Sequence, residues 1–193
     1  IPVFVKFRTG WENDPLFPVD MARRFQEAGA DALTFHPRVA PDRRTRPPRW
    51  DMIRLVQDAV SIPVFGNGNL FEQDDGIRML RQTSCRGLSI GRMAVAKPWM
   101  FAQWTDNFLP GNDVYYQTAL RFTQILQEHF DDHFSVKLFK KYAPYFCANF
   151  KFGHQLLKKL ICGQTMMDIR NNLTSIFESE PEILSRPNIN LFL

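Results

Sequence analysis

Long apolar runs are missing from this sequence of 193 residues. A transmembrane helix needs about 20 consecutive apolar residues, and charged residues, Pro, Gly or Asn interrupt every apolar stretch before that length. The chain also lacks a charged segment followed by an apolar one near its start, so we expect no signal peptide. Because Ile1 already stands in a strand-like run, we interpret the start as a cut through a larger protein.

Cysteine is scarce, with Cys85, Cys147 and Cys162 as the three in the sequence. They form no CxxC pair and no Cys/His cluster, so the sequence gives little support for a zinc site. Scattered thiols in an odd number are typical of reduced cysteines in a cytosolic protein, and we expect a cytoplasmic location. Cys147 and Cys162 stand among apolar helical residues, so we expect both thiols in the core.

Acidic residues are few between residues 36 and 54, so the net charge is unevenly distributed along the chain. The formal net charge is +4. Residues 36–54 hold six arginines against two aspartates, so this window alone carries +4. Its prolines oppose helix formation and keep the segment extended. A concentrated basic loop on a neutral body favours contact with a polyanion, although from charge alone a solvated loop is an equal alternative.

Four short apolar segments have the composition of strands buried on both faces, as in a parallel sheet. They span residues 1–8, 31–36, 62–66 and 87–91. Between them, apolar residues recur at helical spacing from 18 to 28, from 52 to 60 and from 72 to 80, and Gly29 is placed to end the first helix. This alternation predicts an α/β fold, either half of an eight-stranded barrel or a small doubly wound sheet.

The pattern changes after the segment PGND at residues 110–113. No strand pattern follows, and apolar residues recur at helical spacing as far as about residue 177. We therefore expect a domain boundary between residues 111 and 112, with a helical domain beyond it. The tail, with Pro181, Pro187 and several asparagines, is expected to dock loosely or fray.

Polar residues and glycines stand where each predicted strand ends. They are Lys6 and Arg8, then His36 and Arg38, then Gly66–Asn69, and then Gly91 and Arg92. Ligands of parallel α/β folds bind at the carboxyl ends of the strands, so these residues form the candidate site. The last two ends are glycine-containing turns running into helices, which favour backbone contacts with a phosphate. Lys6 needs a partner if it is buried, either an anionic ligand or a carboxylate of the fold.

Five runs of the sequence resemble the dihydrouridine synthase family. They are VFVKFRTGW at 3–11, AGADALTFHPR at 28–38, IPVFGNGN at 62–69, GLSIGR at 87–92 and KPWMF at 97–101. Their order and spacing match the family over about the first hundred residues. The resemblance implies the last four βα units of a TIM (β/α)8 barrel in residues 1–111, followed by an all-α helical bundle domain in residues 112–193 that binds tRNA.

By this resemblance the chain is part of a flavin-dependent oxidoreductase that reduces uridine in tRNA to 5,6-dihydrouridine, with FMN as cofactor and NADPH as reductant. Lys6 would reach the flavin ring, and His36 would line the site. The phosphate end would be held by Asn67, Gly68, Asn69, Gly91 and Arg92. The cysteine that protonates the uracil ring belongs to the first half of the barrel, so no catalytic residue is expected here. That N-terminal half-barrel, or a dimer partner, would close the barrel.

Basic residues of both parts are expected to contact tRNA, because arginine and lysine pair with phosphates. They are Arg38, Arg43, Arg44, Arg46, Lys140 and Lys141. The aromatic residues interleaved with the lysines are expected in the core rather than as stacking surfaces. Two alternatives remain: another FMN- or phosphate-binding TIM-barrel oxidoreductase, which predicts no tRNA affinity, and a non-catalytic RNA-binding module, which predicts salt-sensitive binding without flavin.

Overall fold

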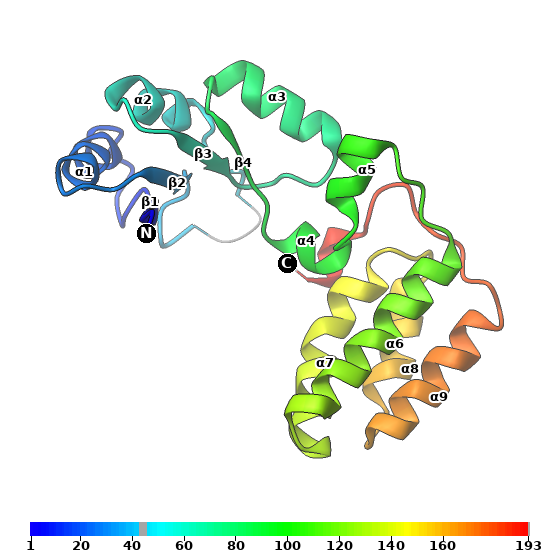
Figure 1. Ribbon diagram of the computed structural model, residues 1–193. Coiled ribbons are helices and arrows are strands. Elements are labelled where there is room, and N and C mark those ends of the chain that lie inside the picture. The colour runs from blue at the N-terminus through cyan, green and yellow to red at the C-terminus, as the bar shows by residue number, and fades with distance from the viewer. Residues whose placement is uncertain (43–45, 193) are drawn as a thin grey trace. The chain divides into compact units, whose positions relative to one another are not determined.

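A computed structural model describes residues 1–42 and 46–192, and it divides into two compact units, Ile1–Gly91 and Arg92–Leu193. The first unit is α/β with a parallel sheet, and the second is built from helices (Figure 1). This division falls earlier than the expected boundary at residues 111 and 112. Helix α4 (Arg92–Ala96) belongs with the later helices because it packs on α7 (Asp132–Cys147), and the carbonyl of Ala96 accepts a 2.8 Å hydrogen bond from Asn149 Nδ2.

The sheet of the first unit has four parallel strands in the order β1-β2-β3-β4. The strands are β1 (Phe4–Arg8), β2 (Ala32–His36), β3 (Val64–Asn67) and β4 (Gly87–Ser89). Helices α1 (Leu16–Glu27), α2 (Asp51–Ala59) and α3 (Gln73–Thr83) connect them. The predicted alternation of strand and helix is therefore present, and Gly29 follows α1 with a φ of 90°.

One face of this sheet is buried under the three helices. Leu33, Phe35 and Val64 point to that face and are fully buried, and they pack against Met52 and Met79, among other helix residues. Full burial of a side chain of this size stabilises the fold by about 1.5–3 kcal/mol. The alternation of strand side chains then sends the intervening residues to the opposite face.

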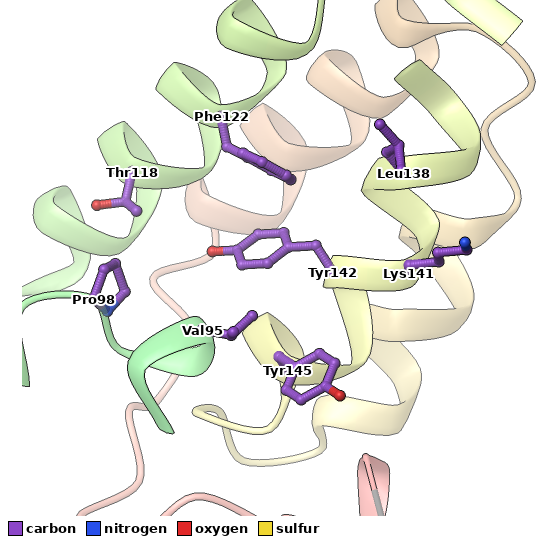
Figure 2. A pocket seen from close by; sticks show the side chains of 8 residues that line it. All are labelled: Val95, Pro98, Thr118, Phe122, Leu138, Lys141, Tyr142 and Tyr145. Atoms are coloured by element: carbon purple, nitrogen blue, oxygen red, sulfur yellow. The ribbon is translucent and has the colours of Figure 1, made fainter. Parts of the chain in front are cut away.

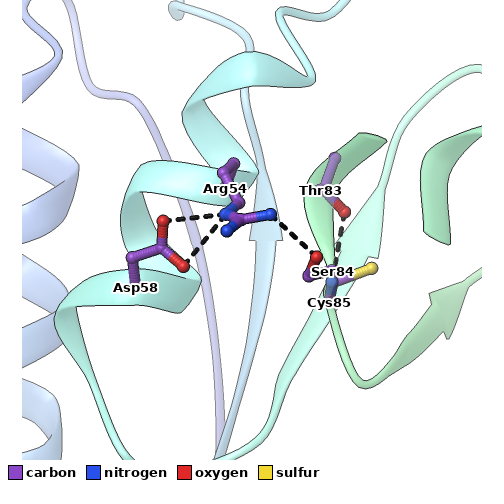
Figure 3. A network of polar contacts seen from close by, with 5 residues as sticks. All are labelled: Arg54, Asp58, Thr83, Ser84 and Cys85. Carbon is purple, nitrogen blue, oxygen red and sulfur yellow. Dashed lines mark hydrogen bonds and ion pairs between the residues drawn. The ribbon is translucent and has the colours of Figure 1, made fainter. Parts of the chain in front are cut away.

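A polar network ties α2 to the end of α3 (Figure 3). Arg54 Nε pairs with both carboxylate oxygens of Asp58, and Arg54 Nη1 donates a 2.8 Å hydrogen bond to Ser84 Oγ. Ser84 ends α3 in the left-handed conformation, with a φ of 53°. The next residue, Cys85, is buried and donates its backbone N–H to Thr83 Oγ1. Cys85 precedes β4, at the end of the strands away from the candidate site.

In the second unit, α7 packs against most of the other helices. They are α4, α6 (Asn112–His129), α8 (Gly153–Ile161), α9 (Met166–Phe177) and the short helix η1 (Ile189–Leu191), while α5 (Met100–Asp106) follows α4. Their core is aromatic, with Phe139, Phe146 and Phe150 almost fully buried. None of the described helices is long and apolar enough to cross a membrane.

The prediction of a loosely docked tail is wrong. The N–H groups of Leu184 and Asn188 donate hydrogen bonds of 2.8 Å to the carbonyls of Asn149 and Ala148. Phe192 is 5% exposed and stacks on Tyr145, with ring centroids 4.8 Å apart. Backbone hydrogen bonds and a buried ring therefore hold the tail to the helices, which composition alone does not reveal.

Candidate functional site

The face of the sheet opposite the helices carries the polar strand residues. In register across it lie Lys6, Thr34, Phe65 and Gly87, one in each strand. Nearer the carboxyl ends, Arg8 pairs with His36 and Asn67 pairs with Ser89. We call these four residues, Arg8, His36, Asn67 and Ser89, the polar row. A sheet face with this many polar groups suits a ligand better than a dry core.

Neighbouring strands hold the polar row in place. Asn67 Nδ2 donates a 2.6 Å hydrogen bond to the carbonyl of Ser89, which ties the end of β3 to the end of β4. Arg8 donates from Nε to the carbonyl of Arg38 and from Nη2 to the carbonyl of Val39, each at 3.1 Å. Arg8 therefore fixes the start of the basic loop against β1.

Gly68 closes the space beside His36. Its φ is 122°, a conformation that side chains with a Cβ rarely adopt. A Cβ at this position would lie 2.9 Å from His36 Cδ2 and 2.9 Å from Pro48 Cγ, so both side chains pack directly on the backbone of this turn. The indole N–H of Trp50 donates a 3.0 Å hydrogen bond to the carbonyl of Gly68 and fixes the turn.

Arg38 differs from its predicted setting. The sequence predicts that it contacts tRNA; in the structure it is 5% exposed, and its Nη2 donates a 3.3 Å hydrogen bond to Asn69 Oδ1. Asn69 itself is left-handed, with a φ of 52°, which asparagine tolerates better than most residues. The pair therefore braces the Gly68 turn from inside, and contact of Arg38 with tRNA stays a prediction.

Lys6 also lies in a different setting from the one predicted, because it is exposed rather than buried. Burial was expected to force a partner on its ammonium group, but Lys6 is exposed in this chain. Phe4, on the same face of β1, is 61% exposed as well. The reason is that no described element of the first unit covers this end of the face. The ammonium group is therefore open to a ligand.

Gly91 ends the first unit and Arg92 begins the second. Gly91 is exposed, and a Cβ there would meet nothing within 4 Å. Arg92 is half-buried at the first position of α4. Their role at a phosphate stays a prediction from the sequence.

The residues expected to contact tRNA fall in different settings. Arg43 and Arg44 lie outside the described residues. Arg46 is exposed and pairs with Asp42 at 2.8 Å. On α7, Lys140 is half-buried and Lys141 is exposed.

The cysteines divide by burial. Cys85 and Cys147 are buried, and burial raises the pKa of the Cys147 thiol well above its usual range. The prediction that Cys162 lies in the core is wrong, because it is exposed just after the end of α8. No group of three His, Cys, Asp or Glu residues in the described part of the chain could hold a metal ion.

Three residues of this site went unrecognised in the sequence. Trp50 stabilises the Gly68 turn through its indole N–H. No local sequence pattern indicates this role, because the partner is eighteen residues away. Thr34 and Ser89 face the same side as Lys6 and Asn67. Period-two counting along each strand from Lys6 and Asn67 could have found them.

Comparison with known proteins agrees with this architecture. The family model described as "Dihydrouridine synthase (Dus)" matches residues 1–159. The tRNA-dihydrouridine synthase B of Pseudomonas syringae pv. tomato is 32% identical over 155 residues, covering 77% of this chain and 46% of that protein. A probable tRNA-dihydrouridine synthase of Treponema pallidum is 38% identical over 131 residues, covering 66% of this chain and 37% of that protein.

The chain thus spans about half the length of the curated relatives it matches. The alignment with a solved structure of a mandelate oxidase variant covers 90% of this chain and 56% of the oxidase chain. Its TM-score of 0.35 at 14% identity is too low to bear on fold or function. With a family model matched over most of its length, this chain belongs to the dihydrouridine synthase family.

Proposed function

We propose that this chain forms the C-terminal part of an FMN-dependent tRNA-dihydrouridine synthase, with the last four βα units of a TIM barrel followed by a helical tRNA-binding bundle. The observation that carries the proposal is the polar row on the face of the sheet that the helices leave open. Family membership supplies the substrate class, because the matched relatives are named for dihydrouridine in tRNA.

The residues of this face fit FMN. At its polar end, the glycine at position 68 lets His36 and Pro48 pack directly on the backbone of the turn, which fixes His36 beside the site. Gly87 leaves room for the ring of Phe65 on the same face of the sheet, because a Cβ there would lie 2.8 Å from that ring. Lys6 supplies a cation on the same face of the sheet as this apolar ring, two strands away, and the polar row supplies hydrogen-bonding groups. A flat, partly apolar and anionic cofactor needs this combination.

Each residue then has a distinct task. Lys6 would place its ammonium group against negative charge on the cofactor ring, and His36 would line the same side. Asn67, Gly68, Asn69, Gly91 and Arg92 would hold the phosphate end. When bound, FMN supplies the hydride that saturates the uracil ring, with NADPH as the source of electrons. The chain's own residues bind and orient, and the proton donor belongs to a part of the protein outside this chain.

The exposed strand β1 supports a larger barrel. β1 stands at one edge of the described sheet, paired with β2 on one side, and its Phe4 is 61% exposed. An edge strand presents unpaired backbone N–H and C=O groups, which pair readily with another strand. We infer that an N-terminal half-barrel, or a second copy of this chain, covers this edge.

Retention of FMN tests the proposal. The purified chain is mixed with FMN, freed of unbound cofactor, and read by visible absorbance. Lys6→Ala and Arg92→Ala are each expected to lower retained flavin. Arg81→Ala is the matched control, because Arg81 is an exposed cation on α3, on the helix side of the sheet.

Each outcome separates the candidates. Flavin that is lost in the two site variants and kept in the control supports the synthase and disfavours a module that binds RNA alone. A colourless chain that gains flavin when the N-terminal half is added assigns the missing contacts to that half. If no flavin binds under either condition, the cofactor assignment fails. Absence of tRNA binding would instead favour another FMN-binding oxidoreductase.

A further inference from the structure

The orientation of one peptide unit at the candidate site depends on Trp50. The indole N–H of Trp50 donates a 3.0 Å hydrogen bond to the carbonyl of Gly68, and the peptide unit between Gly68 and Asn69 is trans. In a planar trans peptide unit the C=O and the N–H point in opposite directions. The N–H of Asn69 therefore points away from the indole, which packs against the helix-side core.

A second set of contacts holds the ring of Trp50. The guanidinium carbon of Arg78 lies 5.2 Å from the centroid of this ring, within the range of a cation–π interaction. Arg78 Nη2 pairs with Asp75 Oδ1 at 2.6 Å, and Asp75 Oδ2 accepts hydrogen bonds from two backbone N–H groups just before α3. These contacts run from the start of α3 to Trp50, so the ring cannot turn away from Gly68 without losing the cation above it.

The other side of the same peptide unit is fixed as well. Asn69 Oδ1 accepts a 3.3 Å hydrogen bond from Arg38, which is 5% exposed. The peptide unit is thus held by Trp50 at the Gly68 carbonyl and by Arg38 through the side chain of Asn69. A backbone N–H that is already oriented can bind an anion without the entropic cost of ordering a mobile loop.

We propose that Trp50 is a positioning residue for the cofactor phosphate: by fixing the carbonyl of Gly68, it aims the N–H of Asn69 at that phosphate. This inference rests on the proposed function, which assigns the phosphate end of FMN to the turn at Gly68. The consequence is selectivity between flavins. Riboflavin has the same ring and ribityl chain but no phosphate, so only FMN gains from the oriented N–H.

The test measures the affinity of the full chain for FMN and for riboflavin by titration of flavin fluorescence, with and without the N-terminal half. Trp50→Phe keeps an aromatic ring beside Arg78 and removes the indole N–H. It is expected to lower the preference for FMN over riboflavin by about ten-fold, as the loss of a hydrogen bond to a charged group does. The affinity for riboflavin is expected to stay unchanged, whereas a purely structural role of Trp50 would lower both affinities together.

Trp99→Phe is the matched control. The indole nitrogen of Trp99 is buried and has no hydrogen-bond partner among the described residues, so this change breaks no such bond. Trp99 follows Pro98, which lines an apolar groove of the second unit together with side chains of α6 and α7 (Figure 2). This groove shares no residue with the candidate cofactor site. Trp99→Phe is therefore expected to keep the full preference for FMN.

Arg78→Met tests the same mechanism through a second residue and keeps the test decisive if Trp50→Phe does not fold. It removes the cation beside the Trp50 ring and is expected to lower the preference by about two- to five-fold. Arg81→Met removes another exposed cation of α3 and is expected to leave the preference unchanged. Circular dichroism verifies that each variant is folded.

Equal affinities of the unsubstituted chain for FMN and riboflavin would overturn the proposal. So would a preference that survives Trp50→Phe, or Arg78→Met where Trp50→Phe is unfolded, and so would a parallel fall in both affinities. A preference lost in Trp99→Phe would also refute it, because that change does not touch the bond to Gly68. FMN binding that persists in these cases leaves the proposed function standing. If neither flavin binds, with or without the N-terminal half, the proposed function fails and this inference with it.

Discussion

Replacing Gly68 by Ala should damage both the stability of the first unit and its candidate cofactor site. A Cβ in a backbone with positive φ costs about 1–2 kcal/mol. At Gly68 it would also lie 2.9 Å from His36 Cδ2 and from Pro48 Cγ, and such overpacking costs a further 1–3 kcal/mol, roughly. The expected total is about 2–5 kcal/mol, and His36 must move to relieve the contact.

Gly29 provides the control for this prediction. Its φ is 90°, but a Cβ there would meet nothing within 4 Å, so Gly29→Ala carries the backbone strain without the contact. Both changes reduce the entropy of the unfolded chain equally. The difference between their losses of unfolding free energy therefore measures the cost of the contact that the Cβ at position 68 makes. Urea denaturation followed by circular dichroism should give Gly68→Ala the larger loss, by about 1–3 kcal/mol. Only Gly68→Ala should lower retained FMN, because only that change forces His36 to move. Equal stability losses, or retention unaffected by Gly68→Ala, would refute the reasoning.

A thiol reagent should modify Cys162 rapidly in the folded chain and leave Cys85 and Cys147 unmodified until urea is added, since only the first is exposed. Backbone N–H groups at the start of α9 lower the pKa of Asp168, so its stabilisation is present above 3.8 and lost as pH falls through the lower folded value. Asp168→Ala should therefore lower the melting temperature at pH 7, with the deficit shrinking in acid. Gly153→Ala should cost about 2–3 kcal/mol in urea denaturation, because its Cβ would overlap the carbonyl of Cys147.

Local patterns were sufficient to predict the elements of the first unit. Strand and helix differ in the period of their apolar residues, and the sequence carries that period within each segment. The strand ends then placed Lys6, His36 and Asn67 near one edge of the sheet, because parallel strands end at the same edge. The register of the strands puts these residues on one face as well.

Contacts between distant segments could not be predicted in this way. The bond from Trp50 to Gly68, the burial of Arg38 against Asn69 and the docking of Phe192 on Tyr145 each depend on how the chain packs. Composition favours an exposed arginine and a frayed tail, and packing overrides both preferences. The exposure of Cys162 has the same cause, since helical spacing alone does not say which side of α8 faces the core.

The open face of the sheet sets what this chain can do by itself. Lys6 is exposed, and an exposed charge interacts weakly because water screens it. Covering the face would lower the local dielectric and strengthen the pairing of Lys6 with an anionic cofactor. Cys85 does not reach this face, because it is buried on the helix side of the sheet and precedes β4. We therefore expect this chain to bind FMN more weakly than a closed barrel would, and to reduce uridine only when other strands complete the site.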